Sequence, residues 1–235
     1  MTLTWATGTH QGRVRDHNED SVYPPEDGTT SDSLLVGVAD GMGGHVAGEI
    51  ASRLALAAAV AADGSPGHRV LAGNDAVIAA TEDDISLRGM GTTISLAEIH
   101  PDGRAVIGHV GDSRIYLLRN GALYQLTEDH TLVAELQAAG KITAEEAVSH
   151  PQRSVLTRAA GLTYALIPDE LEERLEGGDR LILCSDGLSN MIDNDIILSL
   201  ATTESLHQVV WSLIEAANQA GGHDNITVAV VDFQT

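Results

Sequence analysis

The chain has 235 residues and a formal net charge of −21, from 34 acidic against 13 basic residues. This balance argues against proteins that bind nucleic acids or anionic membranes, because both partners require basic patches. Hydrophobic residues make up 43% of the chain and aromatic residues only 3%, so we expect a sizeable core built mainly from aliphatic side chains.

The first polar segment in chain order is "GRVRDHNED", in which Arg15 precedes Glu19 by four residues. An arginine can bind two phosphate oxygens at once, so Arg15 is a candidate phosphate ligand beside an acidic cluster. A surface salt bridge is the alternative that this spacing leaves open. The stretch 24–33, rich in Pro, Gly, Ser and Thr, predicts a loop.

An apolar strand leads into a glycine-rich loop and a helix at residues 34–51, "LLVGVADGMGGHVAGEIA". That order is typical of phosphate binding, yet a carboxylate, Asp40, stands where the anion would lie. The loop is not a dinucleotide fingerprint, whose third glycine would fall at Val46, and it is not a Walker P-loop, because the only lysine is Lys141. Asp40 can therefore face a phosphate only across a metal ion, with the Gly41 carbonyl as a candidate ligand.

Two β-hairpins are predicted in the middle of the chain. The runs "TTISLAEI" and "RAVIGHV" flank "HPDG", and the runs "RIYLLR" and "ALYQL" flank Asn120-Gly121. An Asn-Gly pair between apolar runs is a strong hairpin signal. Consecutive hairpins imply antiparallel sheets and exclude a doubly wound parallel sheet.

Helical patterns cover residues 47–62, 74–87 and 205–220. The polar segment 128–153 predicts two short helices around a Gly-Lys pair, outside the core. Helices that cluster apart from hairpin-forming strands favour one α/β domain, with helices packed outside two antiparallel sheets.

Five short acidic motifs stand out, and the last four adjoin apolar strands: "NED" (18–20), "ADG" (39–41), "GDS" (111–113), "SDG" (185–187) and "HDN" (223–225). Carboxylates at strand ends can converge on one sheet edge, where two charges ~4 Å apart repel by roughly 4 kcal/mol at an effective dielectric of about 20. Cations would relieve the repulsion, and oxygen-only ligands favour Mg²⁺ or Mn²⁺. One Asp-Gly pair alone is typical of a plain turn, but the recurrence favours a metal site. The single cysteine, Cys184, is expected to be a buried strand thiol.

With these motifs in place, the chain resembles the metal-dependent serine/threonine protein phosphatases of the PPM family (protein phosphatase type 2C), in particular their bacterial single-domain branch. The matching segments occur in the family's order, cover nearly the whole chain, and are "GRVRDHNEDSVY", "LLVGVADGMGGHVAGEIAS", "GMGTTIS", "GHVGDSRIYLLRNGALYQLTEDH", "HPQRSVLTRAAG", "GDRLILCSDGLSNMI" and "GGHDNITVAVV". The resemblance implies an α+β fold, a four-layer αββα sandwich of two antiparallel β-sheets flanked by helix pairs. It also implies a single catalytic domain over residues 1–235, with a mobile flap at about 128–153 that influences substrate choice.

The same resemblance implies the ligands of a first metal ion. Asp40 bridges two ions, and the Gly41 carbonyl binds one of them. Asp186 and Asp224 complete the first ion.

Further ligands are implied for the other ions. Glu19 and Asp20 hold the second ion, directly or through water. Asp112 with Asp186 matches an additional third-metal site of bacterial members.

The resemblance also assigns groups around the metals. Arg15 matches a phosphate-binding arginine, and Asn225 matches a polar residue that supports the metal shell. Animal members carry a histidine two residues after the bridging aspartate, where this chain has Met42. We therefore name His45, the nearest histidine, as a candidate general acid. The alternative is that a metal-bound water protonates the leaving group and His45 only orders the loop.

The implied function is metal-dependent hydrolysis of phosphoserine and phosphothreonine in proteins by a metal-bridged water, in opposition to bacterial serine/threonine kinases. The expected cofactors are Mn²⁺ or Mg²⁺, and the expected partners are phosphorylated proteins and a cognate kinase, with no nucleic acid and no membrane. No apolar run reaches the ~20 residues of a membrane span, and the N-terminus lacks a signal-peptide pattern. We therefore expect a cytoplasmic monomer.

Two other functions compete with this hypothesis. A two-metal phosphodiesterase or nuclease would use similar carboxylates, but the charge of −21 opposes polyanionic substrates. A phosphatase-like binding module without turnover would have lost metal ligands, whereas every expected acidic position is filled.

Overall fold

Two antiparallel β-sheets form the centre of the molecule in the computed structural model, which describes residues 1–43, 47–202 and 205–234. The first sheet has the strand order β3-β1-β12-β11-β8-β9, and its strands are β3 (Gly28–Thr30), β1 (Thr2–His10), β12 (Ile226–Gln234), β11 (Arg180–Cys184), β8 (Arg114–Arg119) and β9 (Ala122–Gln125). The second has the order β10-β7-β6-β4-β2, with β5 paired to β4, and its strands are β10 (Asp169–Arg174), β7 (Arg104–Val110), β6 (Ile94–Ile99), β4 (Leu34–Met42), β2 (Asp20–Tyr23) and β5 (Gly91–Thr92).

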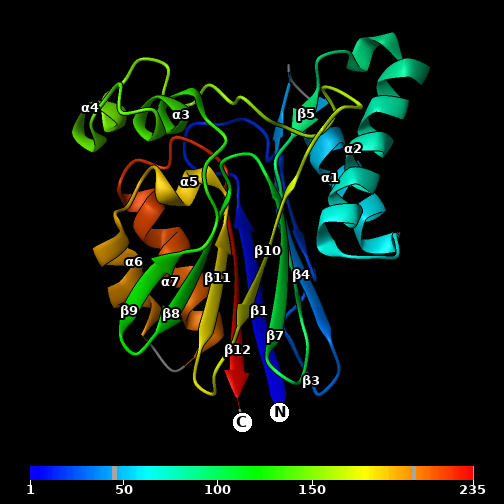
Figure 1. The fold of residues 1–235 in the computed structure, drawn as a ribbon. Coiled ribbons are helices and arrows are strands. Elements are labelled where there is room, and N and C mark those ends of the chain that lie inside the picture. Colours follow the sequence, from blue (N-terminus) through cyan, green and yellow to red (C-terminus); the bar gives the residue numbers. More distant parts are fainter. Residues whose placement is uncertain (44–46, 203–204, 235) are drawn as a thin grey trace.

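Helices cover the outer face of each sheet, as Figure 1 shows. The second sheet carries α1 (Ala47–Ala61) and α2 (Pro66–Asp83), followed by the short η1 (Ile85–Leu87). The first sheet carries α5 (Asp186–Ser189), α6 (Asn194–Ala201) and α7 (Leu206–Gln219). The predicted four-layer αββα sandwich is therefore confirmed.

Two further helices lie outside these layers. In Figure 1, α3 (Leu132–Ala138) and α4 (Ala144–Val148) lie beyond the ends of the sheets, on the side opposite the N- and C-terminal ends. Both lie within the segment 128–153, as predicted. Thr131 caps α3 and Thr143 caps α4 through side-chain hydrogen bonds to backbone N–H groups.

Three buried clusters fill the spaces between the layers. The cluster between the sheets includes Val36, Ile107 and Leu181, none more than 1% exposed. A second cluster packs α6 and α7 on the first sheet, and a third packs α1 and α2 on the second. Aliphatic side chains dominate all three, as the low aromatic content predicts.

Most predicted elements are found, with two corrections. The helices predicted at 47–62 and 205–220 and both hairpins are present, and Asn120 and Gly121 have the positive φ values, 52° and 75°, of a tight hairpin turn. The helix predicted at 74–87 begins earlier, at Pro66, because Ser65 caps its N-terminus, and it ends earlier, at Asp83. The loop predicted at 24–33 contains β3, which pairs with β1. Among the described residues, no helix is long and apolar enough to span a membrane.

Candidate active site

An acidic cavity of about 340 Å³ opens at one end of the two sheets. Its lining residues are Arg15, Glu19, Asp40, Gly41, Met42, Gly43, Thr93, Asp112, Ser154, Leu156, Leu162, Asp186 and Asp224. Asp40 lies on β4 and Asp112 follows β7 in the second sheet, whereas Asp186 follows β11 and Asp224 precedes β12 in the first. The expectation of a single sheet edge is therefore wrong: both sheets contribute carboxylates to the cavity.

Asp20 and Asp40 lie opposite each other in the β2–β4 pair. Like charges so placed repel. Burial raises the pKa of Asp40 well above its ordinary value, and the charges of Asp20 and Asp186 add to the shift. Burial also raises the pKa of Asp20 to about 7, against hydrogen bonds from Thr227 and Ser185. Asp20 and Asp40 are therefore neighbouring buried carboxylates whose charges oppose each other, and of the two it is Asp40 that lines the cavity.

Asp112 and Asp186 also line the cavity. Burial raises the pKa of Asp112 to about 7, and the charges of Asp186 and Asp129 add to that shift. Burial and the charge of Asp224 raise the pKa of Asp186. The Asn190 amide donates a hydrogen bond of 3.0 Å to Asp186 Oδ2.

Arg15 stands at the edge of the cavity with its guanidinium half exposed. Its Nη2 donates to Asp224 Oδ2 at 2.6 Å. Burial lowers the pKa of Arg15, but the charge and hydrogen bond of Asp224 outweigh that effect and raise it overall. The salt bridge left open by the sequence is thus present, and it holds Arg15 beside the carboxylates.

Asn225 fixes the segment that carries Glu19. Its Oδ1 accepts the Glu19 N–H at 2.8 Å, and its Nδ2 donates to the carbonyls of Gln11 and His17, each at 2.8 Å. Asn225 thus holds the backbone around Glu19, and its support of a metal shell stays a prediction.

The carboxylate of Glu19 faces the first turn of α1. A Cβ atom at Gly48 would lie 2.7 Å from Glu19 Cδ, and one at Gly41 would lie 2.1 Å from the Gly48 carbonyl oxygen. Any larger residue would push these segments apart. Burial raises the pKa of Glu19, although the charge of Arg15 opposes the shift.

The donor chemistry of the cavity fits hard divalent cations. All candidate ligands are carboxylate or carbonyl oxygens. Asp20 Oδ1 is buried and has no hydrogen-bond partner in the part of the chain that the structure describes, so a cation would satisfy it. Within residues 1–43, 47–202 and 205–234, however, no three His, Cys, Asp or Glu side chains form a ready-made ligand set. Several carboxylates instead accept bonds from Arg15, Ser185 and Asn190.

Two residues that the sequence analysis did not name hold the central aspartates. Thr93 Oγ1 accepts the Asp40 N–H at 2.9 Å, and the Thr93 N–H donates to the Asp40 carbonyl at 2.9 Å. Ser185 Oγ donates to Asp20 Oδ2 at 2.7 Å. Both lie in segments quoted above, Ser185 beside Asp186 in "SDG" and Thr93 in "GMGTTIS", but neither segment indicates which aspartate its side chain would hold. The candidate acid His45 lies outside the described residues.

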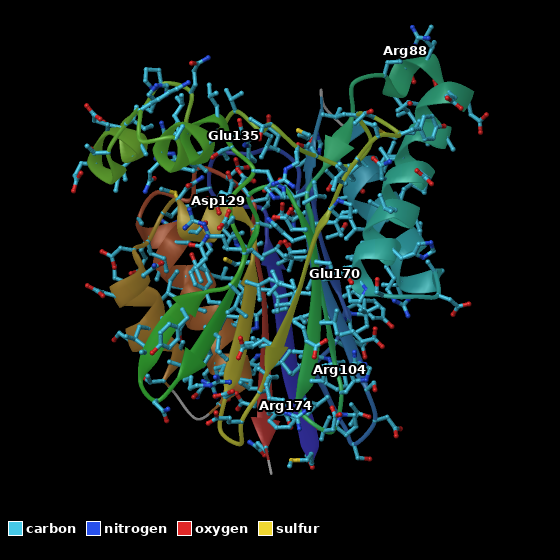
Figure 2. All side chains as sticks on the ribbon, viewed as in Figure 1. Arg88, Arg104, Asp129, Glu135, Glu170 and Arg174 are labelled. Atoms are coloured by element: carbon cyan, nitrogen blue, oxygen red, sulfur yellow. The ribbon has the colours of Figure 1, made fainter. Side chains whose placement is uncertain are left out.

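A second cavity of about 610 Å³ adjoins the first and shares Asp112 and Asp186 with it. It lies between the α3–α4 segment and α5–α6. Figure 2 shows Asp129, which lines this cavity, below Glu135 of α3. The segment 128–153 therefore lines the second cavity, which adjoins the acidic one, and its role as a flap stays a prediction.

Comparison with known proteins identifies the class. The family model "Protein phosphatase 2C" matches residues 7–224. PstP, a serine/threonine protein phosphatase of Mycobacterium tuberculosis (strain ATCC 25618 / H37Rv), is 43% identical over 242 residues, which cover 99% of this chain and 45% of that protein. The serine/threonine phosphatase Stp of Listeria welshimeri is 39% identical, with 95% of this chain and 93% of the relative covered.

A solved structure is similar throughout. It is the catalytic domain of PstP in complex with two manganese ions, with a TM-score of 0.86, 38% identity and 98% of each chain covered. The chain therefore belongs to the protein phosphatase 2C family. It spans about 45% of the length of the M. tuberculosis relative.

Proposed function

We propose that this chain is a metal-dependent phosphatase that removes phosphate from phosphoserine and phosphothreonine in proteins. The supporting observation is the acidic cavity with Arg15 at its edge, in a family whose relatives are named serine/threonine protein phosphatases. Phosphorylated proteins are then its substrates, and a bacterial serine/threonine kinase opposes it. Residues 1–235 act as one catalytic unit and as a monomer, with segment 128–153 as the flap.

The proposed cofactors are two ions of Mn²⁺ or Mg²⁺, and a third ion held by Asp112 and Asp186. The proposed ligands of the two core ions are Asp40, Gly41 through its carbonyl, Asp186, Asp224, Glu19 and Asp20. When bound, such ions supply Lewis acidity that activates water and offsets charge on the phosphoryl group.

The side chains around these ligands position the reactants. Arg15 can donate two N–H groups to phosphoryl oxygens, because its guanidinium is half exposed at the cavity edge. Asn225 keeps Glu19 against α1 through its three hydrogen bonds. Thr93 holds both the N–H and the carbonyl of Asp40. Each of these contacts restricts the motion of a charged group near the phosphate.

Replacing Arg15 by alanine is expected to lower kcat/KM for a phosphothreonine peptide by about 100-fold, within the range for removal of one positioned donor. The half-maximal Mn²⁺ concentration should not rise, because the change removes a positive charge beside Asp224. Steady-state kinetics over a range of Mn²⁺ concentrations measures both quantities. Arg13→Ala is the matched control, since the Arg13 side chain is exposed and its guanidinium lies 3.8 Å from Glu215. Equal losses in both variants would contradict the role of Arg15.

The proposed function is tested with four substrates at one Mn²⁺ concentration. These are one peptide sequence carrying phosphothreonine, phosphoserine or phosphotyrosine, and bis(p-nitrophenyl) phosphate as a diester. We expect turnover of the first two and little of the others. Preferential cleavage of the diester would support the phosphodiesterase alternative, and no turnover of any substrate would support a binding module.

A further inference from the structure

His130 holds the turn that carries Asp112. Its main-chain N–H donates to the Gly111 carbonyl at 2.8 Å, and the Gly111 N–H donates to its Nδ1 at 3.1 Å. Both polar groups of the Gly111 backbone thus bind one residue. The His130 side chain is 1% exposed, so water does not compete for these bonds.

The hydrogen bonds assign the tautomer of this ring. A backbone N–H can only donate, so Nδ1 of His130 is an acceptor and carries no proton. The ring proton is therefore on Nε2, which donates to Asp169 Oδ2 at 3.0 Å. Burial lowers the pKa of His130, although the bond to Asp169 opposes the shift. The uncharged ring agrees with its contact with the buried His109 ring at a centroid distance of 4.8 Å.

The turn depends on such outside support. Gly111 has φ of +109°, a conformation that side-chain-bearing residues rarely adopt, and a Cβ there would lie 2.4 Å from Thr93 Cγ2. On the other side of Asp112, Arg114 makes a bidentate pair with Asp129, with N–O distances of 2.6 and 2.9 Å. Two consecutive residues, Asp129 and His130, therefore bind the chain on both sides of Asp112.

Asp129 and His130 also lie at the base of the segment 128–153, which we call the neck of the flap. There the chain that enters α3 pairs with the chain that returns from α4. The Thr157 N–H donates to the His130 carbonyl at 2.8 Å, and the Leu132 N–H donates to the Val155 carbonyl at 2.9 Å. In Figure 2, Asp129 marks this neck, below α3. His130 thus binds both the Gly111 backbone and the chain that returns from the flap.

We propose that His130, as its Nε2–H tautomer, is a positioning residue that ties the Gly111–Asp112 turn to the neck of the flap and so sets the place of the Asp112 carboxylate. The inference rests on the proposed function, because it treats Asp112 as a metal ligand. It makes cation binding at Asp112 dependent on a side chain that touches neither cation nor substrate.

Two substitutions by amide side chains distinguish the role of Nδ1 from the role of Nε2. In His130→Asn the amide oxygen can take the place of Nδ1 and accept the Gly111 N–H. In His130→Gln the amide extends toward the place of Nε2 and Asp169, and the acceptor for Gly111 is lost. Mn²⁺ binding is measured by titration calorimetry on the full chain, without substrate. We expect His130→Gln to weaken the weakest Mn²⁺ site by about tenfold, whereas His130→Asn stays within about twofold of wild type.

Several outcomes would overturn the proposal. One is an unchanged Mn²⁺ affinity in folded His130→Gln. Another is a Mn²⁺ affinity that falls equally in His130→Gln and His130→Asn. His100→Gln, at the far hairpin between β6 and β7, is the control and should match wild type. If His130→Gln does not fold, nitrogen NMR of ¹⁵N-histidine-labelled wild-type protein still tests the tautomer, and an Nδ1–H signal for His130 overturns the proposal. Absence of Mn²⁺-dependent turnover in wild type would instead refute the proposed function.

Discussion

Replacing Asp40 by asparagine is expected to lower kcat for a phosphothreonine peptide about a thousand-fold or more. Asp40 is the most central carboxylate of the cavity, since the charges of Asp20, Asp112, Asp186 and Asp224 all raise its pKa. An amide retains the shape of the side chain but not its charge, so it would bind divalent cations poorly. Steady-state kinetics at several Mn²⁺ concentrations gives kcat and shows whether excess metal restores it.

The stability of the same variant distinguishes a catalytic loss from unfolding. In the presence of chelator, Asp40→Asn should melt at the same temperature as wild type or higher, because it removes a buried charge that neighbouring carboxylates repel. Asp63→Asn, an equivalent change at an exposed position, should alter neither activity nor melting. A marked fall in the melting temperature of Asp40→Asn, or turnover near wild type, would contradict the assignment.

The fold was predictable where local patterns were strong. The Asn120-Gly121 turn and the apolar runs on both sides of it give the β8–β9 hairpin, and alanine-rich periodicity gives α1. Strand β10, "DELEER", has no apolar run to indicate it, because it lies at the edge of the second sheet and five of its six residues are charged. The early start of α2 was readable from Ser65-Pro66, a cap followed by proline at the first helical position.

The acidic motifs predicted which carboxylates gather, but not how they are held. Motif position alone cannot reveal that Asp40 lies in one sheet whereas Asp186 follows a strand of the other, because that depends on strand order across long sequence separations. The same limit applies to His130, which is 19 residues from Gly111 and contacts it only through the tertiary fold. Short-range spacing therefore identifies the ligand candidates, and tertiary contacts determine their support.

Removal of divalent cations is expected to reduce phosphatase activity to background, and Mn²⁺ should restore it. The same addition should stabilise the protein, because ligands that bind only the folded state raise its free energy of unfolding. At a free Mn²⁺ concentration 100 times Kd, one site contributes about 2.7 kcal/mol, which corresponds to about 5–10 °C in melting temperature for a chain of this size. Activity assays and thermal melts in chelator and in Mn²⁺ measure both effects. Zn²⁺-free buffers exclude effects of trace metal contamination. A control with Ca²⁺ excludes simple screening of the carboxylate charges.

The size of this stabilisation should depend on pH. Asp20 and Asp112 have pKa values raised to about 7 in the folded protein, against 3.8 as the ordinary value. Between these pH values the metal-free folded state binds more protons than the unfolded chain, so its stability falls as pH rises from about 4 to 7. A cation replaces those protons, so the gain in melting temperature on adding Mn²⁺ should be larger at pH 7.5 than at pH 5.5. An equal gain at both pH values would mean that the buried carboxylates are not the groups that bind Mn²⁺, and the acidic cavity would then lose its assigned role.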